Sequence, residues 1–262
     1  MSNYKIFETH AHYDDEAFDE DRDVLLGSMD EKGIQEVVNV CASIDSLEKT
    51  KALMEKYSFV YGAFGIHPDD AELVTEEVLD KVRECCGLEK AVAVGEIGLD
   101  YYWHKEAGEH ELQKKVFRQQ MEIARELHMP FMVHSREAAA DTLDLVKDCV
   151  NRGMYGGIIH CFSYGKEMAR EYLNMGLYLG IGGVVTFNNA RKVKEVVEYA
   201  PLEQIVLETD SPYLSPVPYR GKRNCSLNLP LVAEEIGRIK GISSEEVVRV
   251  TGDNARRLLL RK

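Results

Sequence analysis

The chain has 262 residues, of which 45% are hydrophobic and 29% charged, and its formal net charge is −13. This balance excludes a disordered chain, and the apolar runs are far shorter than the roughly 20 residues of a membrane helix. A protein that held nucleic acid mainly through its surface would normally be basic. The chain therefore either acts on another substrate or supplies local cations, for example bound divalent metals.

The N-terminal sequence lacks an apolar signal core, so we expect a cytoplasmic protein without a membrane segment. Six cysteines lack zinc-finger spacing, and their even number would also allow disulfides. A chain of this length in a reducing compartment does not need disulfides, so we expect free thiols. The cysteines are Cys41, Cys85, Cys86, Cys149, Cys161 and Cys225.

Eight short runs rich in β-branched residues recur along the chain, and each is predicted to be a strand. They cover residues 4–10, 36–42, 59–67, 91–98, 130–135, 156–162, 177–183 and 204–210. The segments between them have helical spacing. In the clearest helix, the predicted apolar stripe consists of Leu112, Val116, Ile123 and Leu127.

Strands that alternate with helices predict βαβ units and a parallel sheet. Eight such units in this length favour a closed (β/α)8 TIM barrel of the α/β class, forming a single domain over residues 1–262. An open α/β sheet is the alternative if some of the runs are not strands. Ser243, followed three residues later by Glu246, has the capping-box pattern that begins a last helix.

Side chains that bind metals recur where the predicted strands end. They are His10 and His12, His67, Glu96, His134, His160, and finally Glu208 with Asp210. In a barrel, the C-terminal ends of all strands converge on one mouth, where active sites lie. Because residues i and i+2 of a strand face the same side, each of the two pairs can point into that mouth.

Imidazole and carboxylate groups clustered in this way would be left unpaired without a cation. We therefore expect two divalent metals, about 3.5–4 Å apart. One would be held by His10, His12, Glu96 and Asp210. The other would be held by His134, His160 and the shared Glu96. Mixed nitrogen and oxygen ligands suit Zn, Mn or Fe better than Ca, and Mg is possible in the carboxylate-rich half.

Seven motifs occur in order along the chain: "THAH", "GIHP", "GEIGLDYY", "HSREA", "HCFSY", "ETDSPYLSPVPYRGKRN" and "GDNARRLL". Together they resemble the signatures of the TatD family of metal-dependent deoxyribonucleases in the amidohydrolase superfamily, over nearly the whole chain. The resemblance implies a two-metal barrel that hydrolyses DNA, often from the 3′ end. It places the family's metal ligands on His10, His12, Glu96, His134, His160 and Asp210.

The chain departs from the family pattern in two places, the first motif and the residues after "RGKRN". Relatives commonly have Asp, Cys and Leu where this chain has Glu8, Ala11 and Tyr13, although both histidines of the motif remain. After "RGKRN", relatives often continue Glu-x-Pro, and this chain has Cys225-Ser226-Leu227. Many binuclear amidohydrolases bridge their two metals with a carbamylated lysine on the fourth strand. This chain has Glu96 on that strand instead.

The expected reaction is attack on phosphorus by a metal-activated water. Asp210 or Glu208 would accept the proton, and Glu208 has the alternative role of supporting a ligand from behind. Asp100 either orients a histidine ligand or caps a turn.

Cationic residues near the mouth are predicted to contact DNA phosphates. Phosphate sites in such barrels often use the loops after strands seven and eight, and the predicted phosphate contacts there are Arg220, Lys222 and Arg223, although such a run can also be a solvated loop. His67 and Arg136 are further predicted substrate contacts. Tyr101, Tyr102 and Trp103 would stack on an unpaired base or pack at the mouth. We expect single-stranded or 3′-terminal DNA as the substrate, without an obligate protein partner.

Two other functions fit part of the sequence. A binuclear amidohydrolase acting on an amide, lactone or aminoacyl ester would keep the metals, and the net charge of −13 favours it. The arginine and lysine cluster favours the phosphodiesterase. A non-catalytic metal-binding barrel should have lost ligands, whereas the ligand set is complete.

Overall fold

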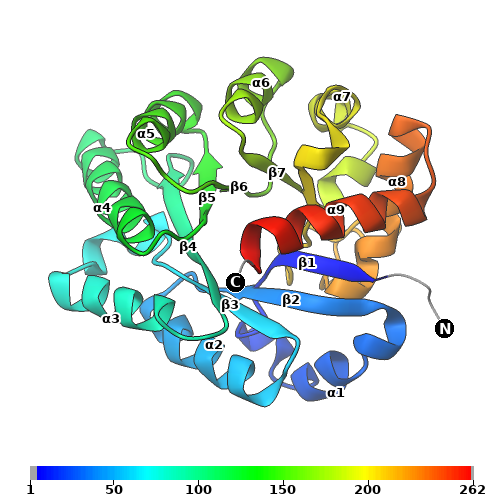
Figure 1. Ribbon diagram of the computed structural model, residues 1–262, viewed down its shortest axis with the longest axis horizontal. Coiled ribbons are helices and arrows are strands. Elements are labelled where there is room, and N and C mark those ends of the chain that lie inside the picture. Colours follow the sequence, from blue (N-terminus) through cyan, green and yellow to red (C-terminus); the bar gives the residue numbers. More distant parts are fainter. Residues whose placement is uncertain (1–4, 261–262) are drawn as a thin grey trace.

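The computed structural model describes residues 5–260. Figure 1 shows strands in the middle of the molecule and helices around them. One sheet contains eight strands in chain order, each parallel to the next. They are β1 (Ile6–Ala11), β2 (Ile34–Val40), β3 (Val60–Phe64), β4 (Ala91–Asp100), β5 (Phe131–Arg136), β6 (Gly157–Ile159), β7 (Tyr178–Ile181) and β8 (Ile205–Leu207). The predicted (β/α)8 barrel is confirmed.

The helices follow the strands, and all but the last lie around the outside of the barrel. They are α1 (Arg22–Gly27), α2 (Ile44–Lys56), α3 (Glu76–Cys86), α4 (Ala107–Glu126), α5 (Ala139–Asn151), α6 (Lys166–Asn174), α7 (Arg191–Tyr199), α8 (Leu229–Lys240) and α9 (Ser244–Leu259). Ser243 caps α9 by accepting a hydrogen bond from the backbone N–H of Glu246, so the predicted helix start is confirmed. The Glu246 carboxylate accepts from Arg249. None of the described helices could cross a membrane, and all six cysteines are free thiols.

The predicted apolar stripe of α4 is wrong at its two ends. Val116 and Ile123 are buried, but Leu112 and Leu127 are 37% and 36% exposed. The buried face instead includes two glutamines, because they satisfy backbone groups of the end of β4 and of the loop after β3. Gln120 bonds to both the N–H and the carbonyl of Ile66, and Gln113 does the same for Asp100.

A separate apolar cluster contains strand residues and the last helix. Phe7, Val92 and other strand residues pack together with Ala255, Leu258 and Leu259 of α9. Phe7 and Val92 lie near the start of their strands, so α9 covers the N-terminal end of the barrel. The C-terminal end, where the predicted site lies, is left for the loops that follow each strand.

Hydrogen bonds between the first strand and the segment after the last strand close the barrel. The backbone N–H of Asp210 donates to the carbonyl of His10 at 2.9 Å, and that of His12 donates to Ser211 at 2.8 Å. A parallel bridge joins Ala11 to Ser211. The closing seam therefore brings His10 of β1, and His12 directly after it, beside Asp210.

Candidate metal centre

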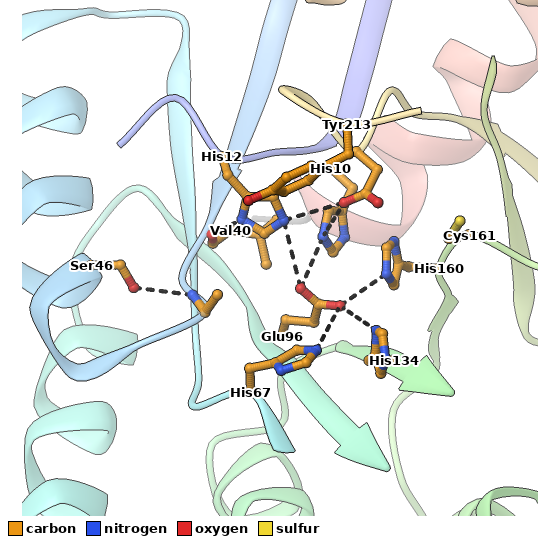
Figure 2. A network of polar contacts seen from close by, with 12 residues as sticks. His10, His12, Val40, Ser46, His67, Glu96, His134, His160, Cys161 and Tyr213 are labelled. Atoms are coloured by element: carbon orange, nitrogen blue, oxygen red, sulfur yellow. Dashed lines mark hydrogen bonds and ion pairs between the residues drawn. The ribbon is translucent and has the colours of Figure 1, made fainter. Parts of the chain in front are cut away.

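Glu96 lies in the middle of five imidazoles (Figure 2). Its Oε1 is 2.9 Å from both His134 Nδ1 and His160 Nε2, and 3.9 Å from His67 Nε2. Its Oε2 faces the other side, 3.4 Å from His10 Nε2 and 3.6 Å from His12 Nε2. One buried carboxylate therefore divides the histidines into two groups.

Asp210 completes the group on the β1 side. Its Oδ1 lies 3.3 Å from His12 Nε2 and 4.0 Å from His10 Nε2. Asp210 follows the end of β8 and has a φ of 57°, a conformation that non-glycine residues seldom adopt. Because the strand has already ended, the expected alternation of Glu208 and Asp210 does not apply, and the two side chains have different surroundings.

Glu208 lies behind His160. Its Oε1 is 3.5 Å from His160 Nδ1 and accepts a 2.5 Å hydrogen bond from the backbone N–H of Cys161. The Nε2 atom of the same histidine faces Glu96. This position matches the alternative role considered for Glu208, that of supporting a ligand from behind.

Two further histidines have an outer partner of the same kind. His12 Nδ1 lies 2.8 Å from the carbonyl of Val40, and His134 Nε2 lies 3.2 Å from Asp100 Oδ2. Metal-binding histidines typically donate their second ring N–H to a carbonyl or carboxylate, which fixes the tautomer and the ring orientation. His12, His134 and His160 therefore have the orientation that a bound cation requires.

His10 provides the strongest test of whether a cation fits. It is buried, its ring stacks 3.8 Å from that of His160, and within the described chain neither ring nitrogen has a hydrogen-bond partner. Unpaired buried polar atoms are costly. Burial alone would raise the pKa of Glu96, but the charges of His160 and His10 bring that pKa well below its usual value. An ionised carboxylate among imidazoles with unpaired nitrogens is a donor set that fits a divalent cation.

Three groups of donor atoms lie within 4.8 Å of one another: His10 with His160 and Asp210, His10 with His12 and Glu96, and His67 with Glu96 and His134. His160 therefore lies near His10 and Asp210 as well as sharing Glu96 Oε1 with His134, the residue with which the sequence places it. The structure also brings His67, predicted as a substrate contact, next to this carboxylate. His67 Nδ1 accepts from the backbone N–H of Asp69 at 3.2 Å, which leaves Nε2 directed at the site.

The predicted phosphate contacts differ in how freely their charges are presented. Arg223 forms an ion pair with Asp21 through both of its Nη atoms, at 2.7 and 2.6 Å. Arg220 and Lys222 are exposed, and the Arg220 guanidinium lies 4.3 Å from the ring centroid of Phe187. Arg136 is also exposed and lies over Tyr102. Three of the four cations are thus available to an anion.

The role of Glu8 was missed from the sequence. Its carboxylate is buried and accepts hydrogen bonds from the backbone N–H groups of His10 and Thr209 and from the hydroxyls of Thr209 and Ser226. It therefore ties β1 to the segment that carries Asp210. An acidic residue inside an apolar strand was the available signal.

The chain is similar to known proteins over nearly its whole length. A family model described as TatD related DNase matches residues 7–260. YabD of Bacillus subtilis, an uncharacterized metal-dependent hydrolase, is 40% identical over 97% of this chain and 98% of its own. The 3′-5′ ssDNA/RNA exonuclease TatD of Cronobacter sakazakii is 30% identical over 93% of this chain and 94% of its own.

Solved structures agree with these similarities. The crystal structure of YJJV, a TatD homolog from Escherichia coli, has a TM-score of 0.91 at 25% identity and covers 98% of this chain and 99% of that chain. An organophosphorus hydrolase from Deinococcus radiodurans has a TM-score of 0.60 at 15% identity, with 98% and 93% covered, which shows a shared fold.

Proposed function

The chain belongs to the TatD-related DNase family of metal-dependent hydrolases, and from that premise we propose that it hydrolyses phosphodiester bonds of DNA. We propose single strands or 3′ ends as the preferred form of substrate. The observation that carries the proposal is Glu96, whose two oxygens face two separate groups of imidazoles. Sites with two divalent cations are common in enzymes that cleave phosphodiesters.

We propose that two divalent cations, with Zn, Mn and Mg as the candidates, bind on the two sides of Glu96. The ligands would be His10, His12, Glu96, His134, His160 and Asp210. Bound cations would stabilise the negative charge that develops on the phosphate and make water a stronger nucleophile at neutral pH. His67 lies close enough to the Oε1 side to contact the same phosphate.

Asp210 is the residue proposed to take the proton from the attacking water. Its side chain is 18% exposed, compared with 4% for Glu96 and 1% for Glu208. Water from the mouth therefore reaches Asp210 more easily than either of the other two carboxylates. The hydrogen bond with His12 lowers the pKa of Asp210 against the effect of burial, so the group is ionised and able to accept. Glu208 serves the same step by orienting His160.

Exposed cations explain how a chain with a net charge of −13 could hold a polyanion. Arg220 and Lys222 lie in the loop after β8, and Arg136 ends β5 two residues after His134. Phosphates bound by these side chains would lie at the barrel mouth. The acidic remainder of the surface would repel nucleic acid and limit binding to this mouth.

A nuclease assay tests the proposal. The protein is incubated with 3′-labelled single-stranded DNA and Mg, Mn or Zn, with His134→Ala as the inactive control. Cleavage by the unmodified chain and its loss in the variant are expected. No cleavage with any metal, together with hydrolysis of a small amide, lactone or aminoacyl ester, would replace the phosphodiesterase with the amidohydrolase alternative.

A further inference from the structure

An exposed aromatic turn follows β4, the strand that carries Glu96, and its two outermost rings contact mainly each other and neighbouring cations. This turn, residues 101–105, connects β4 to α4. Trp103, the only tryptophan of the chain, is 65% exposed, and Tyr102 is 38% exposed. Large aromatic side chains stabilise a fold mainly when they are buried, so these two rings add little to the packing of the fold and are open to a ligand.

The turn is held rigidly, and its position is tied to a candidate metal ligand. Asp100 Oδ1 accepts hydrogen bonds from the backbone N–H groups of Tyr102 and Trp103, at 2.8 and 3.1 Å. Asp100 Oδ2 lies 3.2 Å from His134 Nε2. A single buried carboxylate thus fixes both the turn and the imidazole, so that the position of the turn is tied to that of a candidate metal ligand.

The first residue of the turn adds further anchors. The Tyr101 hydroxyl donates to Asp141 at 2.7 Å, its ring stacks on His110 with centroids 3.6 Å apart, and its backbone N–H donates to the carbonyl of Arg136. These contacts leave the neighbouring rings as a preformed surface, which reduces the entropy lost when a ligand binds.

A cation accompanies the exposed rings. The guanidinium carbon of Arg136 lies 4.0 Å from the centroid of the Tyr102 ring and 5.6 Å from that of Trp103. Among residues 5–260, no carboxylate pairs with Arg136. Arg136 covers one face of Tyr102, whereas most of Trp103 stays open. An open indole next to an unpaired guanidinium matches one nucleotide, with a base to stack and a phosphate to neutralise.

We propose that Trp103 stacks on an unpaired nucleobase next to the scissile phosphate, while Arg136 contacts an adjoining phosphate. This rests on the proposed function and narrows it to unpaired strands, because the bases of a duplex are already stacked on their neighbours. It also assigns Trp103 a binding role without a part in the chemical step. Its removal should raise KM and leave kcat nearly unchanged.

The test combines a side-chain change with a base deletion. Initial rates are measured on single-stranded oligonucleotides in which one abasic site is moved stepwise from the cleaved end. Trp103→Ala should raise KM about tenfold, the order expected for the loss of one base stack. For the unmodified chain, an abasic site at the stacked position should raise KM by the same factor. For Trp103→Ala, the abasic site should not raise KM any further. Trp103→Phe should retain part of the affinity.

Tyr199→Ala is the matched control. Tyr199 is a 48% exposed aromatic residue at the end of α7, which leads to the start of β8 and so lies at the other end of the barrel. Suppose that the unmodified chain cleaves DNA and that Trp103→Ala and Tyr199→Ala have equal KM values on it. This result would overturn the stacking proposal without contradicting the proposed nuclease activity. The stacking proposal would also be overturned if, at every position of the abasic site, the increases in KM from Trp103→Ala and from the abasic site were additive.

Fluorescence separates failure of the inference from failure of the proposed function. Because the chain has one tryptophan, its emission reports on Trp103 alone. Saturable quenching by oligothymidylate in the presence of a chelator, which prevents cleavage, is expected. Quenching without cleavage under any metal would support the stacking site and contradict the nuclease. Cleavage without quenching would contradict the stacking site alone.

Discussion

Asp100 Oδ2 lies 3.2 Å from His134 Nε2, and the other oxygen of the same carboxylate holds the turn that carries Trp103. The link joins the end of β4 to the end of β5. Its consequence is that the orientation of a candidate ligand depends on a residue that does not face the centre itself.

Asp100→Asn should weaken the enzyme without unfolding it. The amide oxygen can still accept from the turn, but its NH2 group would face His134 Nε2 and could not replace the carboxylate. Loss of such an outer partner typically costs about 10–100-fold in metal affinity or activity. Metal titration and kcat measurements test this, with the melting temperature as the check on folding. Unchanged affinity and kcat would show that the link has no role in positioning His134.

Glu8→Gln should lower the stability of the barrel seam. Each oxygen of Glu8 accepts two hydrogen bonds, and an NH2 group in place of one oxygen would face two donors. Burial raises the pKa of Glu8 to about 8, so above that pH, where the group is ionised, the expected loss is about 2 kcal/mol in the free energy of unfolding, or about 4 °C in melting temperature. Urea and thermal unfolding measure it, with the exposed Glu16→Gln as control. Equal stability of the two variants would contradict the assigned role.

Arg220→Ala and Lys222→Ala should each weaken binding of single-stranded DNA and reduce its dependence on salt. Each phosphate contact that is lost should reduce the slope of log K against log salt by about 0.7. Arg223→Ala should leave the slope unchanged, because its guanidinium is already paired with Asp21. Binding measured at several salt concentrations distinguishes the three. If Arg223→Ala reduced the salt slope more than the other two variants did, Arg223 and not Arg220 or Lys222 would be the phosphate contact.

Glu235 should make stability depend on pH below about 4.5. A hydrogen bond from Arg238, with a second from Lys194, lowers its pKa from 4.5 to about 2. Because the pKa is depressed in the folded chain, the stabilisation is present above pH 4.5 and is lost as the pH falls toward 2. It should amount to about 1 kcal/mol, since Arg238 is exposed and solvent screens the pair. In urea unfolding across this pH range, the free energy of unfolding should fall less steeply for Glu235→Gln than for the unmodified chain. Identical pH profiles for the two proteins would contradict a stabilising role of the Glu235 ion pair.

The strands and most of the centre could be predicted because their signals are local. The eight apolar runs correspond to the eight strands, and residues at strand ends meet at one mouth in any such barrel. His10, His12, His134 and His160 come together for that reason, and Glu96, which lies within β4 and not at its end, faces them. The hydrogen bond from His134 to Asp100 is also present, as one of the two roles considered for Asp100.

Other features depend on contacts between distant segments, which no local pattern contains. The ion pair of Arg223 with Asp21 joins the loop after β8 to the loop before α1. The separate positions of Glu208 and Asp210 follow from the early end of β8 at Leu207. His67 lies near Glu96 and His134 because of the path that the loop after β3 takes.

The central claim is that Glu96 is shared by two divalent cations. The most direct measurement is the number of Zn ions bound per chain at saturation, determined by equilibrium dialysis and elemental analysis for the unmodified chain, Glu96→Gln and the exposed control Glu89→Gln. We predict about two ions in the unmodified chain and the control, as in two-metal hydrolases, and a loss of bound metal in Glu96→Gln. One ion or fewer per unmodified chain, or full binding by Glu96→Gln, would contradict the claim.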